Sequence, residues 1–555
     1  MGIAFMTTLK RQPKLPLRHA LLTLAFVGVT SLLCAQYPRI TSDIQAEANR
    51  RRAEADARSD AAWTAAQPVI EAWAATGKPY LPGAARPSDL PQADIPAFPG
   101  AQGGGMYSFG GRGGKIFVVT NLNDSGPGSF REAAEAGGPR IVIFNVAGII
   151  HLKERVRIRA PYITIAGSTA PGDGVCIAGD TVELETHDVV IRHMRFRRGA
   201  TWVGDRNDSL GGHPVGNILI DHVSTSWGLD ENLSMYRHVY SPPDGGKDLK
   251  LPTVNITIQN SLSAEALDTY NHAFGSTLGG YNSTFLRNLW ASNSGRNPSV
   301  GMFYDFTFAN NVIFNWRYRT IDGGDHRSFF NIINNYFKPG PATSLAEPSG
   351  WRILRPESRR AKPPVDEFGK AYVAGNIVEG NARVTADNWD GGVQIRTTAD
   401  GNAEELLKSI RAKKPYPHAW LELLSAEDAF EYVLANAGAT RPRRDAVDAR
   451  VIESVRTGRP TYQTGIITDI EQVGGFPPYE GTPYPDSDGD GLPDDWETRY
   501  GLDPHDASDA HGDLNGDGYT NIEEFINGDD PTALKPAWTK PPGYVDLWKD
   551  RDLRN

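Results

Sequence analysis

Short runs of β-branched and aromatic residues recur from about Phe98 to residue 400, and their spacing most constrains how this chain can fold. Each run ends at a small polar residue and a turn, and nine runs can be aligned on that residue, at steps of 22 to 41 residues. Stacked coils of a parallel β-helix allow such variation, because only the loops that leave a coil absorb insertions. The aligned positions are Asn145, Gly167, His193, His222, Asn260, Asn288, Asn311, Asn335 and Asn376.

This repeat predicts an all-β fold, a right-handed parallel β-helix over residues 97–400. Asparagines that recur at one position would form an internal ladder, in which each side-chain amide bonds to those in the coils above and below. The alternative is an antiparallel sandwich, but hairpin signals at about 8 to 12 residue spacing are not dominant.

The segments that flank the repeat have a different character. Residues 36–96 combine an Ala-, Glu- and Arg-rich stretch, predicted to be helical, with a proline-punctuated linker. Residues 401–475 show helical spacing, with Gly438 as a stop signal, and are expected to pack on the solenoid. A linker at 476–485 leads to an acidic segment at 486–530, and residues 531–555 form a tail.

The first 35 residues have the features of a secretory signal peptide. Basic residues precede an apolar run from Ala20 to Leu33, and the small residue Ala35 ends it. A membrane anchor would need about 20 apolar residues, and bulky Leu33 disfavours lipid attachment at Cys34. We therefore expect an exported protein, extracellular or periplasmic, that is cleaved near Ala35. Its one remaining cysteine, Cys176, leaves no internal disulfide.

The net charge of −10 is concentrated in one segment. Between Asp486 and Asp530 the chain has fifteen acidic residues and one basic residue, Arg499, so the rest of the chain is slightly basic. The acidic average therefore does not exclude an acidic polymer as a partner of the main body. We expect no nucleic-acid partner, no membrane span and a monomer.

Two 12-residue stretches in the acidic segment match the EF-hand loop, with oxygen donors at positions 1, 3, 5, 7, 9 and 12 and glycine at position 6. Hard oxygen donors in a flexible loop favour Ca²⁺, whereas the alternative is a solvated acidic linker. The pairing resembles dockerin-like and thrombospondin type 3-like calcium modules, which implies a structural or attachment role and no part in catalysis. The first loop offers Asp486, Asp488, Asp490, the Leu492 carbonyl, Asp494 and Glu497, and the second Asp513, Asn515, Asp517, the Tyr519 carbonyl, Asn521 and Glu524.

Acidic and basic side chains gather around one coil of the repeat. Asp205, Asp208, Asp230 and Glu231 flank it beside several arginines, which suggests a bound metal and an anion. Five stretches between residues 97 and 340 add a resemblance: AFPGAQGGG, GGRGGKIFVVTNLNDSGPGSFREA, YITIAGSTAPGDGVCI, ILIDHVSTSW and SGRNP. They are similar to the pectate lyase family of polysaccharide lyases.

The resemblance implies a secreted, calcium-dependent lyase that cleaves a 4-linked polyuronate, with pectate as the expected substrate, by β-elimination. The partner that it implies is an acidic plant-type or algal polysaccharide. It assigns to Arg296 the removal of the proton alpha to the uronate carboxylate, and to Asp208 and Asp230 the binding of Ca²⁺. Because arginine normally stays protonated, we expect calcium to acidify the substrate proton. The alternatives are a structural ion pair for Arg296 and a turn-forming role for Asp208.

The chain also departs from the family pattern. The family lysine that assists substrate binding is missing, and His272 is the nearby candidate to replace it. Ser234 stands where a further carboxylate is usual, and the second family arginine is replaced near Gly301. Calcium is therefore expected to bind weakly without substrate. Glu231 is a third candidate ligand, although it would point away from Asp230 if the strand continued.

Arg317 and Arg319, one coil beyond Arg296, are candidates for contacts with substrate carboxylates. Two other functions stay open at this point. One is a non-catalytic carbohydrate-binding solenoid or adhesin, which the missing lysine and arginine favour. The other is a pectin-directed glycoside hydrolase on the same fold, although its expected aspartate pair is not found.

Overall fold

The computed structural model describes residues 40–201, 203–302, 304–536 and 538–542. The predicted signal peptide at 1–35 and the end of the predicted tail lie outside the described residues. In the described part of the chain, no helix combines the length and apolar character needed to cross a membrane. Cys176 is free and buried.

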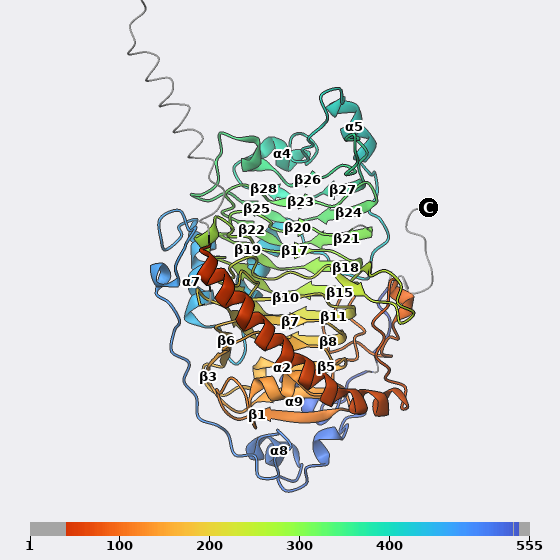
Figure 1. The fold of residues 1–555 in the computed structure, drawn as a ribbon, viewed down its shortest axis with the longest axis vertical. Coiled ribbons are helices and arrows are strands. Elements are labelled where there is room, and N and C mark those ends of the chain that lie inside the picture. Colours follow the sequence, from red (N-terminus) through yellow and green to blue (C-terminus); the bar gives the residue numbers. More distant parts are fainter. Residues whose placement is uncertain (1–39, 202, 303, 537, 543–555) are drawn as a thin grey trace, which may run out of the picture. The chain divides into compact units, whose positions relative to one another are not determined.

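Two long parallel sheets and a third, interrupted face form the solenoid, and their strands stack coil upon coil (Figure 1). In each long sheet the strand order follows the chain, which is the arrangement of a parallel β-helix, so this prediction is confirmed. The first sheet contains β1 (Lys115–Val119), β2 (Arg140–Phe144), β5 (Ile163–Ala166), β8 (His187–Arg192), β11 (Gly216–Asp221), β15 (Val254–Gln259), β18 (Tyr281–Leu286), β21 (Tyr304–Ala309), β24 (Ser328–Ile333) and β27 (Lys370–Ala374).

The second sheet and the third face complete each coil. The second sheet contains β3 (Gly148–His151), β6 (Val175–Ala178), β9 (Arg195–Arg197), β12 (Ser224–Ser226), β16 (Leu262–Ala264), β19 (Leu289–Ala291), β22 (Val312–Phe314), β25 (Tyr336–Lys338) and β28 (Ile377–Val378). The third face contains β4 (Val156–Ile158), β7 (Val182–Leu184) and β10 (Leu210–Gly212), then β17 (Thr277–Leu278), β20 (Ser299–Val300), β23 (Ile321–Gly323) and β26 (Leu354–Pro356). One loop forms an antiparallel hairpin of β13 (Arg237–Tyr240) and β14 (Leu249–Pro252).

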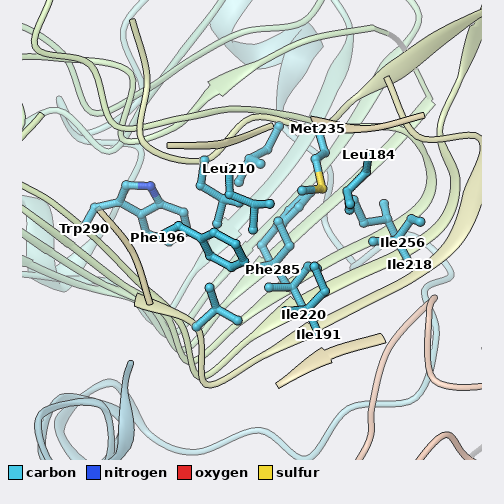
Figure 2. Close-up of a cluster of buried hydrophobic side chains, with 14 of the residues drawn as sticks. Leu184, Ile191, Phe196, Leu210, Ile218, Ile220, Met235, Ile256, Phe285 and Trp290 are labelled. Carbon is cyan, nitrogen blue, oxygen red and sulfur yellow. The ribbon is translucent and has the colours of Figure 1, made fainter. Parts of the chain in front are cut away.

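The core lies inside the coils and is built from apolar side chains stacked in register. Ile191 on β8 pairs with Ile220 on β11, which pairs with Ile258 on β15, and Phe285 on β18 follows. All four are fully buried, and Figure 2 shows three of them beside Phe196 and Trp290 from the second sheet. Because every coil repeats the inward positions, each coil buries the apolar surface of its neighbours.

Helices cover the solenoid on both sides of the repeat in sequence: both segments were predicted to contain helix, and packing on the coils was predicted for the second. The long helix α2 crosses the third face (Figure 1), where its Asp56 binds Arg155, just before β4, and Arg157 within β4. Helices α6 and α7 pack their apolar faces on the outside of the second sheet. The helices are α2 (Ser42–Ala74), α3 (Phe130–Glu135), α4 (Ala382–Ala386), α5 (Ala403–Ile410), α6 (Ala426–Asn436), α7 (Ala446–Thr457), α8 (Asp494–Tyr500) and α9 (Asn521–Asn527), with short 3₁₀ helices η1 (Pro87–Asp89), η2 (Gly167–Thr169), η3 (Asp268–Tyr270), η4 (Pro348–Trp351), η5 (Ile470–Val473) and η6 (Asp509–His511).

The expected asparagine ladder exists, but it begins later in the chain than the alignment placed it. Side-chain amides link Asn288 to Asn311, Asn311 to Asn335 and Asn335 to Asn376, at 2.8 to 3.1 Å, and Asn376 to Asn388 at 2.9 Å. In the coil before Asn288, Ser261 stands in register and its hydroxyl accepts from the Val223 amide at 3.1 Å, whereas Asn145 bonds the backbone of Tyr484 instead of a ladder neighbour.

Four of the aligned residues, Gly167, His193, His222 and Asn260, belong to a neighbouring column, so the alignment was wrong by one residue there. The strand register places His222 beside Asn260, and Asn260 beside Arg287 rather than Asn288. His193, His222, Asn260 and Arg287 all have φ between 50° and 57°. Asparagine is common in this left-handed conformation, so a second column of polar residues forms at the strand ends for a reason unrelated to the ladder.

We expect Asn311→Ala to destabilise the solenoid by about 3 kcal/mol, because it leaves several buried groups without partners. The Asn311 amide accepts from the backbone and side chain of Asn288 and donates to the Phe285 carbonyl at 2.9 Å. Urea unfolding measures the loss. The matched control is Asn49→Ala on the exposed surface of α2, which should change stability by less than about 0.5 kcal/mol. Equal effects of the two substitutions would contradict the ladder's role.

Candidate functional site

The stacking of four consecutive coils brings the predicted catalytic residues to one side of the solenoid. Asp208 precedes β10, and Asp230 and Glu231 follow β12. Single parallel bridges join Glu231 to Phe274 in the next coil, and Phe274 to Gly295 in the coil after that. Arg296 follows Gly295 directly, so the stacking brings together residues that are separated by 88 positions in sequence.

Three carboxylates converge at this place. Oxygens of Asp208, Asp230 and Glu231 all lie within 4.8 Å of one another, and the Glu231 amide donates to Asp208 Oδ1 at 3.0 Å. Burial and the charges of Glu231 and Asp230 raise the pKa of Asp208 well above its usual value. Glu231 does not point away, because no regular strand continues through residues 227–235.

This donor set fits a hard divalent cation. The three groups supply only oxygen, which is the ligand type that Ca²⁺ prefers, and a divalent charge would offset their mutual repulsion. Asp208, Asp230 and Glu231 are therefore the groups of this chain that could hold calcium in the groove.

Arg296 is held beside these carboxylates. Its Nη1 forms an ion pair with Glu231 Oε1, which also accepts from Thr277 Oγ1 at 2.8 Å. The guanidinium lies over the Phe274 ring, 4.6 Å from its centre. Burial alone would lower the pKa of Arg296, but the Glu231 carboxylate outweighs it, so the pKa is raised. In this arrangement Arg296 is a positioned cation.

His272, the candidate for the missing lysine, contacts Asp230 through Nε2. Burial would raise the pKa of Asp230, but the hydrogen bond and charge of His272 outweigh burial and lower it. The His272 ring also packs on Phe274, 4.1 Å between ring centres. His272 therefore lies at the edge of the carboxylate cluster and contacts it through Asp230.

Arg317 and Arg319 both have acidic partners within the fold. Arg317 binds Asp268 at 2.6 Å, and Arg319 binds Asp322 at 3.1 Å. The Arg319 guanidinium also lies over the Phe274 ring, 4.8 Å from the ring centre. Their side chains are about a quarter exposed, so part of each guanidinium faces solvent.

An open pocket of about 290 Å³ surrounds the carboxylates and Arg296. Arg317, Arg319 and His272 are not among its lining residues. Sequence reasoning missed Thr277, which lines the pocket and donates to Glu231, and Phe274, whose ring packs on Arg296, because neither residue type signals chemistry by itself. The lining residues are Thr181, Glu183, Asn207, Asp208, Gly211, Gly212, His213, Asp230, Glu231, Ser234, Tyr236, Thr277 and Arg296.

The first predicted calcium loop has a ring of inward carboxylates. Asp486 accepts from the amides of Gly489 and Gly491 at 2.9 and 3.1 Å, a turn that gathers Asp488 and Asp490 around it. Asp494 instead bonds the Ser487 amide and hydroxyl at 2.7 and 2.8 Å. The Leu492 side chain is fully buried against the solenoid.

Glu497 and a residue outside the loop complete this cluster. Carboxylate oxygens of Asp490, Glu497 and Asp509 lie within 4.8 Å of one another. Burial and the charges of Asp490 and Asp488 raise the pKa of Glu497 to about 8. Asp509 was missed because it lies twelve residues after the loop ends, beyond the spacing that defines the motif.

The second predicted loop repeats the turn but not the cluster. Asp513 accepts from Gly516 and Gly518 at 2.8 and 2.9 Å, as Asp486 does in the first loop. Asp517 accepts from the Tyr519 amide at 2.9 Å. The remaining predicted ligands bond within the protein: Asn515 to Glu524 at 3.3 Å, Asn521 to the Leu514 amide at 3.2 Å, and Glu524 to Lys535 at 3.0 Å.

Curated relatives resemble this chain over most of its length. A protein of Aspergillus flavus named Probable pectate lyase C is 36% identical over 446 residues, which cover 79% of this chain and 94% of the relative. The protein of the same name from Aspergillus terreus is 36% identical over 445 residues, with the same coverage. Pectate lyase 1 of Cryptomeria japonica is 30% identical over 177 residues, 29% of this chain and 45% of the relative.

No family model matches the sequence. Among solved structures, the major allergen from cedar pollen aligns over 61% of this chain and 92% of its own, with 17% identity and a TM-score of 0.38. Pectate lyase II from Xanthomonas campestris aligns over 62% of this chain and all of its own, with 14% identity and a TM-score of 0.34. These two scores are low, and the curated relatives carry the comparison.

Proposed function

Because this chain belongs to the pectate lyase family, we propose that its lyase activity resides in the pocket of Asp208, Asp230, Glu231 and Arg296. The enzyme is a polysaccharide lyase, and pectate is the substrate that the names of its relatives indicate. The single observation that carries the assignment to this pocket is the convergence of three carboxylates beside a half-buried arginine.

We propose that Asp208, Asp230 and Glu231 hold Ca²⁺ in the groove. Bound calcium would supply positive charge that binds the uronate carboxylate and makes the neighbouring C–H more acidic. Glu231 Oε1 is already engaged by Arg296 and Thr277. Sharing that carboxylate with a cation weakens its ion pair with Arg296, which frees the guanidinium to turn toward the substrate.

In the proposed reaction, Arg296 first gives up one guanidinium proton to solvent, and the neutral guanidine then takes the proton from the carbon alpha to the uronate carboxylate. The electron pair of that C–H bond forms a carbon–carbon double bond, and the bond to the glycosidic oxygen at the next carbon breaks. Solvent protonates the departing oxygen. Arg319 and Arg317 are proposed to attract the carboxylates of neighbouring sugars, and His272 to orient Asp230.

The test is spectroscopic. Purified protein mixed with polygalacturonate and calcium should produce an unsaturated product that absorbs ultraviolet light, and a chelator should abolish the signal. Pectin, rhamnogalacturonan and alginate serve as comparison substrates. Saturated reducing ends without ultraviolet absorbance would refute the elimination, and an unchanged rate in chelator would refute the role of calcium.

Two further assignments belong to the same proposal. Residues 1–35 are proposed to direct export, on the basis of their basic and apolar pattern. Residues 486–530 are proposed to form a calcium module that stabilises the protein without taking part in catalysis. The inward carboxylates of the first loop support this role.

A further inference from the structure

The cluster in the first loop has carboxylate oxygens that nothing in the protein satisfies. Glu497 is fully buried, and neither of its carboxylate oxygens has a hydrogen-bond partner. Asp488 Oδ2, Asp490 Oδ2 and Asp509 Oδ1 likewise lack partners. A buried, unpaired carboxylate costs several kcal/mol, so these oxygens point to a cation that they share.

Asp509 reaches this cluster from a separate element. It begins η6, and its backbone carbonyl accepts from Asn521 Nδ2 at 2.8 Å, at the start of α9. The backbone N–H of Asn521 also donates to the Gly512 carbonyl at 2.7 Å. An ion held by both Glu497 and Asp509 would therefore join the first loop to the segment that carries the second.

The second loop already contains a positive charge. Lys535 Nζ lies 3.0 and 3.1 Å from the two oxygens of Glu524, 3.3 Å from Asp529 and 3.6 Å from Asp517. Three residues later, Trp538 packs edge-on against Tyr107 at 5.5 Å between ring centres. This contact anchors the segment, so the ammonium is present at a high effective concentration.

The two loops also differ in charge. Asn515 and Asn521 in the second loop stand where the first loop has Asp488 and Asp494. Fewer carboxylates lower the calcium affinity of such a loop. A calcium ion at the second loop would also have to displace Lys535 from Glu524.

We propose that the module binds one calcium ion, in the first loop with Asp509 as an additional ligand, and that Lys535 serves as the cation of the second loop. This inference rests on the proposed assignment of residues 486–530 to calcium binding. It replaces two equivalent sites by one metal site and one internal ion pair.

The experiment counts calcium ions by isothermal titration calorimetry on the full chain. Asp208→Asn combined with Glu231→Gln removes two of the three groove carboxylates and so disables that site, which leaves the module to be measured. We expect one ion per chain in this background. Adding Asp509→Asn should weaken its binding at least tenfold, and adding Lys535→Met should raise the number of ions to two.

The matched control is Lys408→Met, which removes another lysine paired with a glutamate, Glu404, on the exposed surface of α5. It should leave the count at one. Two ions bound while Lys535 is intact, or one ion still bound after Lys535→Met, would overturn the inference while leaving the calcium assignment standing. No ion bound in any of these proteins would refute both.

Discussion

Arg296→Lys is expected to lower kcat/KM for polygalacturonate by about 10² to 10⁴-fold, the range for losing a positioned proton-transfer group. Lysine keeps the positive charge but lacks the planar guanidinium that reaches Glu231 and stacks on Phe274. Its ammonium would be set back from the substrate and more strongly hydrated. Initial rates of ultraviolet absorbance at saturating calcium measure the loss.

The matched control for this prediction is Arg383→Lys, which alters an arginine paired with Asp390 on the exposed surface beyond the last coils. Its rate should stay within about twofold of the parent, since exposed ion pairs contribute little. Thermal melts of both variants should match the parent protein. A fully active Arg296→Lys protein would remove Arg296 from the reaction.

The coil architecture could be predicted from sequence because each coil repeats the same inward apolar positions. The exact residue alignment could not, as the column of Asn260 shows. Both the amide ladder and the left-handed corner select asparagine, one for its hydrogen bonds and the other for its tolerance of positive φ. When two physical requirements favour the same residue type at adjacent positions, the sequence alone does not show which requirement each residue meets.

The candidate site, too, could be predicted only in part from the sequence. Asp208, Asp230 and Arg296 were proposed from their motifs, and the structure places them together. The direction of Glu231 depended on whether a strand continued, which local sequence did not reveal. Phe274 reaches Arg296 from another coil, and Asp509 and Lys535 reach the two predicted calcium loops from positions outside those loops. No spacing rule could therefore have found them.

The proposed calcium module, residues 486–530, lies against the first coils of the solenoid. Leu492, Ile522 and Ile526 of the module form one apolar cluster with Ile141 and Ile143 on the outer face of β2. The approach is close at Gly491, where φ is 97° and a Cβ would lie 2.3 Å from Ile143 Cδ1. Because the first sheet begins here, the module covers apolar strand surface that would otherwise face water.

Polar contacts fix the same interface. Glu523 binds Arg112 at 2.8 Å, and the Tyr519 hydroxyl donates to the Pro96 carbonyl at 3.1 Å. Ser168 Oγ donates to the Ile526 carbonyl at 3.0 Å. This interface couples the folding of the module to the folding of β1, β2 and β5. A metal that orders the module would therefore stabilise these coils as well.

Removing calcium is expected to destabilise the first coils, not only the module. A ligand present at a thousand times its Kd stabilises the folded state by about 4 kcal/mol, so chelation should cost an amount of that order. Hydrogen exchange should become faster in β1, β2 and β5 and stay unchanged in β24 and β27. Glu497→Gln should make stability much less sensitive to chelator. Its control, Glu453→Gln on the exposed surface of α7, should respond like the parent protein.

The effect of chelation should also grow with pH. Without calcium, the pKa of Glu497 is raised to about 8, above its ordinary value near 4.5, by burial and by the Asp490 and Asp488 charges. Between these two values the folded chain holds a proton that the unfolded chain has lost, so the calcium-free protein becomes less stable as the pH rises through this window. Calcium needs the ionised carboxylate and therefore binds more tightly as the pH rises. The difference in melting temperature with and without calcium should thus be larger at pH 8 than at pH 5, and a difference that shrinks with rising pH would contradict the role given to Glu497.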